Sequence, residues 1–153
     1  MFLFIDTTQP NKIFLLLFDS HKIIAKINQK TEQRKSEQCL FLIDKIFKKS
    51  RKKLKNLTGI AVMNQAGTFS DVRLGVILAN CLSWSLKIPA IDVLPSDQAG
   101  LKHSANQLRK IILNKINQAK LGNLIKPIYT KEPNIILSRR NFKKSKQFNN
   151  LTI

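Results

Sequence analysis

The chain has 153 residues, of which 43% are apolar, and its formal net charge at pH 7 is +18. This length accommodates one domain with one hydrophobic core, and the apolar content excludes a chain that is disordered throughout. The sequence lacks both the basic start of a signal peptide and an uncharged run near the ~20 residues of a membrane span, so we expect a soluble, cytoplasmic protein that does not enter a membrane.

The first elements along the chain are short and apolar. Strands are predicted over residues 2–7, 12–20 and 22–28, with turns at 9–11 and 19–21. Two turns in quick succession favour an antiparallel meander at the start of the sheet.

Helices and strands then alternate. A helix over 36–54 has Ser36 as its N-cap, Glu37 in its first turn and basic residues at its end, which suits the helix dipole. The elements expected after it are a strand at 57–63, a helix at 69–86 stopped by Pro89, a strand at 90–93, and a helix at 97–121 ended by Gly122. Residues 125–136 are expected to be irregular or strand-like, and the basic tail after Ser138 loose.

The predicted order β-β-β-α-β-α-β-α gives an α/β protein with a mixed five-stranded sheet and helices on its faces. This order matches the half-domain shared by the actin-like ATPases and the RNase H-like enzymes. We expect an actin-like domain over residues 1–121 and a C-terminal extension over 122–153. Fold alone does not define chemistry.

The cysteines and histidines do not form a site. Cys39 and Cys81 lie in apolar stretches without the spacing of zinc ligands or a redox pair, so both are expected to be buried thiols. His21 and His103 stand alone and are expected in turns or at the surface. No Walker loop or G-x-G-x-x-G segment occurs, so we predict neither a metal nor a cofactor.

Two predicted helices are apolar on more sides than a sheet can cover. In 69–86 almost no polar face remains, and residues 39–43 are five consecutive apolar positions. Either the helices cover one another, or another chain completes an apolar ridge, which we favour because small domains seldom expose large apolar patches without a partner. The predicted interface residues are Leu40, Ile43, Phe47, Leu74, Ile77, Leu78, Cys81 and Leu82.

A family resemblance appears in the segment 61–75, AVMNQAGTFSDVRLG. It resembles the TsaB (YeaZ) family motif A-V-G-x-G-P-G-S-F-T-G-V-R-I-G. Asp6 and Thr7, in the opening I-D-T-T, resemble the family's I-D-T-S start, and residues 127–131 resemble its P-x-Y-x-R element. The residues that carry the motif are Asp6, Thr7, Gly67, Phe69, Val72, Arg73 and Gly75.

The resemblance implies an actin-like fold and a non-catalytic role in making threonylcarbamoyladenosine on tRNA. In that family, TsaB pairs with the catalytic subunit TsaD through a bundle of the first two helices of each, and the ATPase TsaE joins them. The partners implied are therefore a TsaD-like subunit and a TsaE-like ATPase, with tRNA contacted weakly or indirectly. A homodimer through the same helices stays open.

The chain also departs from the family pattern. Three glycines of the motif are replaced by Met63, Gln65 and Asp71, and its proline by Ala66. Glycines let a backbone approach a phosphate closely, whereas Asp71 places a negative charge at a helix N-terminus, where it disfavours an anion. We therefore expect no nucleotide at this turn, and a second lobe that is largely missing.

Two other functions stay open. An RNase H-like nuclease would place Asp6 in the first strand with Asp92 or Asp97 and Glu37 around magnesium ions. A stand-alone RNA-binding module would use the net charge of +18. The same charge also follows from a genome rich in A/T, which raises lysine content everywhere, and no clear set of stacking aromatics lies among the basic residues.

Overall fold

Five strands form one mixed sheet. The computed structural model describes residues 1–31, 34–98 and 104–130, and its strands are β1 (Phe2–Asp6), β2 (Lys12–Phe18), β3 (Ile23–Lys30), β4 (Gly59–Met63) and β5 (Ala90–Val93). They lie in the order β3-β2-β1-β4-β5. The first three pair antiparallel, and β4 and β5 run parallel to β1. The predicted meander and mixed sheet are confirmed.

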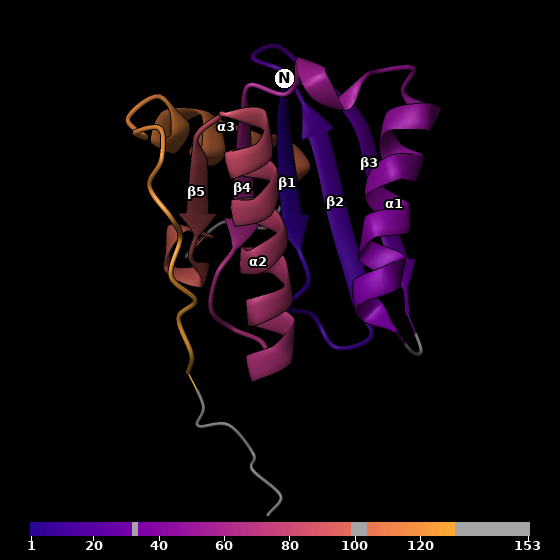
Figure 1. Cartoon of the computed structure of the whole chain (residues 1–153), viewed down its shortest axis with the longest axis vertical. Coiled ribbons are helices and arrows are strands. Elements are labelled where there is room, and N and C mark those ends of the chain that lie inside the picture. Colours follow the sequence, from indigo (N-terminus) through magenta and orange to yellow (C-terminus); the bar gives the residue numbers. More distant parts are fainter. Residues whose placement is uncertain (32–33, 99–103, 131–153) are drawn as a thin grey trace, which may run out of the picture.

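Three helices cover the two faces of this sheet (Figure 1). They are α1 (Lys35–Lys49), α2 (Phe69–Leu86) and α3 (Ala105–Ile116), and two short 3-10 helices, η1 (Leu54–Asn56) and η2 (Pro95–Gln98), lie in the connections. Helices α1 and α2 share one face, where α1 packs on β2 and β3 and α2 on β4, while α3 lies on the other face. In the described residues, none of these helices is long and apolar enough to cross a membrane.

The sheet is buried on both faces because its central strands are apolar at nearly every position. Along β1, Leu3 and Ile5 pack under α1 and α2, whereas Phe4 between them packs on the α3 side. Side chains of a strand alternate between the faces, so a continuous apolar run supplies both cores. This explains why the central strands were predictable from apolar runs rather than from alternation.

The first helix differs from its prediction at both ends. It starts at Lys35, so Ser36 is not its N-cap; Arg34 takes that position with a left-handed φ of 52° and no side-chain cap bond. It ends at Lys49, where Ser50 Oγ donates to Ile46 O over 2.8 Å and Arg51 turns left-handed with φ 54°. The predicted end, Leu54, belongs to η1 instead.

The third helix is shorter than its prediction. Residues 95–98 form η2, and α3 begins at Ala105, after the N-cap Ser104, which makes a reciprocal capping box with Gln107. The helix ends at Ile116, so Gly122 does not terminate it. Residues 117–130 are irregular, His21 is exposed in the β2–β3 turn, and His103 and the tail after Ser138 lie outside the described residues.

Candidate functional site

The residues that follow β1 turn back and donate hydrogen bonds to the carboxylate of Asp6, the last residue of the strand. Asp6 is only 6% exposed, and its Oδ1 accepts hydrogen bonds from Thr8 N at 2.8 Å and Thr8 Oγ1 at 2.7 Å. Its Oδ2 accepts a longer bond from Gln9 Nε2 at 3.3 Å. The carboxylate therefore closes a turn, a structural role that short acidic side chains commonly take.

The other carboxylates considered for a nuclease are separately engaged. Asp92 accepts from Asn64 Nδ2 at 3.2 Å, Asp97 pairs with Lys115 at 2.7 Å, and Glu37 is an exposed partner of Arg34. The Lys115 bond and the Leu94 N–H hold the pKa of Asp97 below its usual value although burial acts to raise it. Across the part of the chain that the structure describes, no three His, Cys, Asp or Glu residues are grouped to hold a metal ion.

The turn between β4 and α2 has a left-handed backbone at two residues that are not glycine. Gln65 and Ala66 have φ angles of 85° and 65°, a left-handed conformation that costs residues with a Cβ about 1–2 kcal/mol each. Gly67 is needed for contact with the β1 turn, because a Cβ at this position would lie 2.9 Å from the Cα and carbonyl oxygen of Thr8. Proline cannot adopt the positive φ that Ala66 has, so the turn is strained and also differs from the motif's turn at position 66.

Helix α2 begins on a polar cluster that joins three elements. Thr68 caps the helix, since its Oγ1 accepts from Asp71 N at 3.2 Å and donates to Asp71 Oδ2 at 2.8 Å. Lys35, from the first turn of α1, places its ammonium 2.7 Å from Asp71 Oδ1. The same ammonium donates to the carbonyl oxygens of Thr7 at 2.6 Å and Gln9 at 2.9 Å.

This cluster occupies the position where an anion would meet the helix N-terminus. Both members of the Lys35–Asp71 pair are largely buried, with side-chain exposures of 17% and 15%. Sequence reasoning identified Asp71 but missed Lys35. A lysine in the first turn of a helix opposes the helix dipole, and this unfavourable position is the feature of the sequence that could have identified Lys35.

Gly75 sets the distance between α2 and the sheet. A Cβ there would lie 2.7 Å from Thr7 Oγ1 and 3.1 Å from Val62 Cγ2. Thr7 Oγ1 in turn donates to Asp71 O over 2.7 Å, and Val72 beside it is 1% exposed. These motif residues therefore form one packed junction of β1, β4 and α2.

The remaining motif residues meet the C-terminal segment. Phe69 stacks on Tyr129 with ring centroids 4.3 Å apart, and the exposed Arg73 lies over the Phe69 ring. Asn64 fixes the same segment, donating to Lys126 O and accepting from Ile128 N, each at 2.9 Å. The two stretches that carried the family resemblance, 61–75 and 127–129, are thus brought together.

An apolar face remains exposed on α1 and α2. We define the outer helix face by its five members, whose side chains point away from the sheet: Leu40, Phe41, Ile77, Cys81 and Trp84. Trp84 is 81% exposed and Phe41 63%. Ile77, Cys81 and Trp84 follow the three- and four-residue spacing of one helix stripe.

The predicted interface residues differ in how deeply the structure buries them. Ile43 and Phe47 are each only 5% exposed and belong to the core, because α1 turns them onto β2 and β3. Leu74, Leu78 and Leu82 are half-buried. Phe41 and Trp84 are exposed on the same two helices but do not belong to the predicted set.

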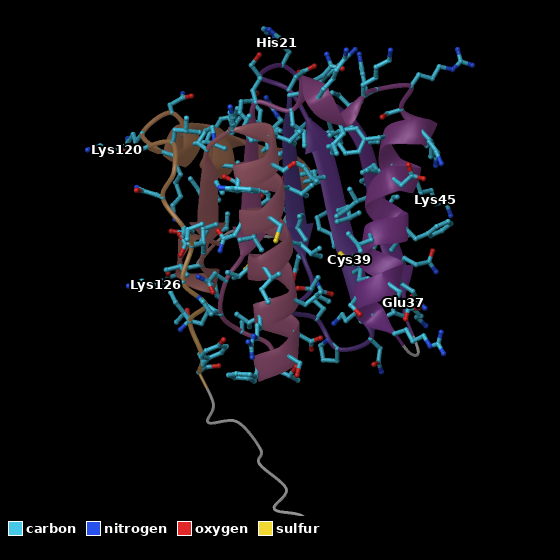
Figure 2. All side chains as sticks on the ribbon, in the orientation of Figure 1. His21, Glu37, Cys39, Lys45, Lys120 and Lys126 are labelled. Atoms are coloured by element: carbon cyan, nitrogen blue, oxygen red, sulfur yellow. The ribbon has the colours of Figure 1, made fainter. Side chains whose placement is uncertain are left out.

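The two cysteines also differ from each other. Cys39 is buried as predicted, and burial raises the pKa of its thiol to about 11 despite the nearby Lys35. The prediction that Cys81 is buried was wrong, because it lies on the outward stripe of α2. Figure 2 shows Cys39 between α1 and the sheet, with Lys45 and Glu37 of the same helix pointing away.

A cavity of about 510 Å³ opens on the α3 side of the sheet. Its floor is apolar, from Phe4, Phe14 and Met63, and Lys26 and Asn28 of β3 line one wall. Asp6 and Ala66 border it at the carboxyl ends of β1 and β4. The polar cluster of Lys35 and Asp71 does not line this cavity.

The fold is that of an actin-like or RNase H-like half-domain, as in YeaZ. YeaZ from Pseudomonas aeruginosa superposes with a TM-score of 0.56 at 17% identity, over 61% of this chain and 43% of that one. A second structure, an uncharacterized protein similar to peptidase YeaZ from Pseudomonas aeruginosa, gives a TM-score of 0.57 at 17% identity, over 61% and 42% of the two chains.

Residues 23–131 match the family described as TsaD, tRNA N6-adenosine threonylcarbamoyltransferase, and the chain belongs to that family. Among curated proteins it is similar to tRNA threonylcarbamoyladenosine biosynthesis protein TsaB of Buchnera aphidicola subsp. Schizaphis graminum, at 25% identity over 109 residues. That match covers 69% of this chain and 52% of the relative, so the chain spans about half the length of the protein it matches. The resemblance to TsaB is confirmed.

Proposed function

We propose that this chain takes part in threonylcarbamoyladenosine biosynthesis by pairing, through the outer helix face, with a TsaD-like protein. The observation that carries the proposal is the exposed apolar stripe of Ile77, Cys81 and Trp84 on α2. Burying a fully exposed large apolar side chain supplies about 1.5–3 kcal/mol, and Trp84, at 81% exposed, comes nearer to that limit than Ile77, at 47%. A partner that covers the stripe would recover this free energy.

The composition of the face suits a protein partner. Trp84 and Phe41 are large aromatic side chains, the kind that dominates the energetics of protein interfaces. The Lys45 ammonium lies 5.9 Å from the centroid of the Phe41 ring, so a charged side chain borders the apolar members of the face. The family membership supports a TsaD-like protein as the partner.

The proposed role of this chain is non-catalytic. It is supported by the way Asp6, Lys35 and Asp71 bond to groups of their own junction. Because these groups already hydrogen-bond to other residues of the chain, they are poorly placed to act on a substrate. A TsaE-like ATPase remains a further proposed member of the assembly.

A binding experiment tests the pairing. The chain and the TsaD-like protein of the same cell would be purified separately and titrated by calorimetry. Phe41→Glu and Ile77→Glu should each weaken binding by about tenfold or more, since each places a charge in an apolar interface. Leu121→Glu, at a position that is 63% exposed but lies on the C-terminal segment, is the matched control and should bind normally.

Cys81 provides a second readout without mutation. Its exposed thiol should react with a maleimide in the free chain and become protected in the complex, while the buried Cys39 stays unreactive in both. Unchanged binding by the two glutamate variants, or no protection of Cys81, would contradict the proposed face. Sedimentation of the free chain would distinguish a homodimer through the same residues.

A further inference from the structure

Strand register brings several connections to one end of the sheet. Phe2 at the start of β1 pairs with Phe18 at the end of β2 and with Gly59 at the start of β4. The β2–β3 turn and the connection 50–58 after α1 therefore meet at this end. Figure 1 shows the N-terminus, η1 and the last turn of α1 there together.

The exposed side chains at this end are predominantly cationic. We define the basic end by its members Lys22, Lys49, Arg51, Lys52, Lys53, Lys55 and Lys87, all of which are exposed. Within the described ranges, none of them forms an ion pair. His21 lies at the tip of the β2–β3 turn (Figure 2).

The acidic groups near the basic end are already engaged. Asp19 accepts hydrogen bonds from the backbone N–H groups of Lys22 and His21, which lower the pKa of its carboxyl. Asp44 pairs with Lys48 at 2.6 Å. Asp19 stays ionised and Lys48 balances Asp44, so the single charge of Asp19 opposes the seven exposed cations of the basic end.

Neither the helix dipole nor composition accounts for this arrangement. The dipole favours cations in the last turn of α1, but Arg51, Lys52 and Lys53 lie beyond the helix. A biased genome raises lysine content everywhere without sorting it in space. At the opposite end, the carboxyl ends of the parallel strands and the start of α2 carry acidic residues beside the basic ones: Asp6, Asp71, Asp92 and Asp97.

We propose that the basic end binds the phosphate backbone of RNA without reading its sequence. Lysine ammonium groups on exposed loops suit phosphate contacts, which supply most of the non-specific affinity for nucleic acid. The two loops, 19–22 and 50–58, present no exposed large apolar side chain, so they lack the wedge that an interfacial membrane segment inserts. The family to which the chain belongs is described by a reaction on tRNA.

This inference does not depend on the pairing with a TsaD-like protein. It concerns the ends of α1 and of the strands, whereas the outer helix face lies on the sides of α1 and α2. It is tested on the isolated chain. A failure of RNA binding therefore leaves the pairing proposal untouched, and the reverse also holds.

The experiment measures fluorescence anisotropy of a fluorescein-labelled tRNA at several NaCl concentrations. The triple variant K52E/K53E/K55E should bind more weakly, and the slope of log K against log salt should become shallower by about 2–3, because each lost phosphate contact removes about one unit. K26E/K30E/K126E is the matched control: its lysines are equally exposed but lie along β3 and on the C-terminal segment. It should keep the slope of the wild-type chain.

Three results would overturn the proposal. Equal weakening by both triple variants would show that net charge alone, not the basic end, attracts RNA. Unchanged RNA binding by K52E/K53E/K55E would exclude this surface directly. If K52E/K53E/K55E lost binding to phosphatidylserine vesicles but bound RNA as the wild-type chain does, the basic end would be assigned to a membrane surface. The neutral variant K52Q/K53Q/K55Q, checked by circular dichroism, replaces the glutamate variant if the latter does not fold.

Discussion

Lys35 illustrates how one side chain can hold a junction that no local pattern reveals. Its ammonium bonds to Asp71 and to the carbonyl oxygens of Thr7 and Gln9, so it ties α1 to the β1 turn and to α2. Asp71, one of the departures from the family motif, finds its partner here. The substitution that disfavours an anion has therefore become part of the packing.

Replacing Lys35 should destabilise the chain substantially. Lys35→Met leaves Asp71 largely buried without its partner, and we expect a loss of about 2 kcal/mol, the range for a hydrogen-bonded charge. The measurement is urea denaturation followed by circular dichroism. A loss below about 0.5 kcal/mol would show that water replaces the ammonium at little cost.

The matched control is Lys48→Met on the same helix. Lys48 also makes a close ion pair, 2.6 Å from Asp44, but the two side chains are 76% and 55% exposed. Exposed pairs of this kind contribute about 0.3–0.5 kcal/mol. Equal losses for the two variants would mean that burial does not distinguish the pairs.

Residue-scale prediction succeeded where a family motif marked the position and failed where residue type alone had to indicate the role. The motif resemblance identified Gly67 and Gly75, and both prove to be close-approach positions, against Thr8 and Thr7. The engagement of Asp6 by Thr8 lies within two residues, yet Asp6 was also a candidate metal ligand. Acidic residue type alone does not distinguish a turn from a metal site.

Among the elements, α2 was predicted with its observed bounds. Its limits are local: Thr68 caps the start, Lys87 takes a left-handed φ of 53° after the last turn, and Pro89 follows. Helix α3 was predicted too long because a run of apolar and basic residues continues past both of its ends. Its real start depends on the Ser104–Gln107 capping box, which competes with that run.

The C-terminal segment is an element that no periodicity predicts. It lies along the molecule beside α2 and β5 (Figure 1). Two asparagines hold it by exchanging paired hydrogen bonds with its backbone, as a neighbouring strand would. Asn80 donates to Ile125 O at 2.9 Å and accepts from Ile125 N at 3.0 Å, and Asn64 clamps residues 126 and 128. Residues this distant in sequence leave no local signal.

Asn80→Ala should release this segment locally. Removing both side-chain bonds leaves Ile125 N to exchange with solvent, so we expect its hydrogen exchange to accelerate by about tenfold or more, which corresponds to 1.4 kcal/mol or more of lost protection. NMR-detected exchange measures it. Amides in the middle of α2 serve as the internal control, and their acceleration in parallel would indicate global destabilisation instead.

At the scale of the whole molecule, the sequence specifies the charge but not its distribution. Composition gives +18, and from composition alone an RNA-binding surface and a biased genome are indistinguishable. The fold adds the location of the charge, because strand register brings the β2–β3 turn and residues 50–58 to one end. The outer helix face likewise required the fold, which sorted Ile43 and Phe47 into the core and left Phe41 and Trp84 outside.

A chain this cationic should be stabilised by moderate salt. Repulsion among the unpaired lysines of the basic end extends about 30 Å at 0.01 M ionic strength but only about 8 Å at 0.15 M. The exposed ion pairs that salt also screens contribute little. We therefore expect Tm to rise by a few degrees between these conditions, since 1 kcal/mol corresponds to about 2–4 °C for a domain of this size. Differential scanning calorimetry in NaCl measures the change.

The variant K52E/K53E/K55E provides the decisive comparison for this salt effect. Each change removes two units of positive charge from the basic end, so the repulsion that salt relieves becomes smaller. The variant should melt higher than the wild-type chain at low salt and respond less to added NaCl. K26E/K30E/K126E removes the same charge from dispersed positions and should have a smaller effect, because unit charges interact most strongly at short separation. A Tm that falls with salt in the wild-type chain would show that attractive pairs dominate its electrostatics.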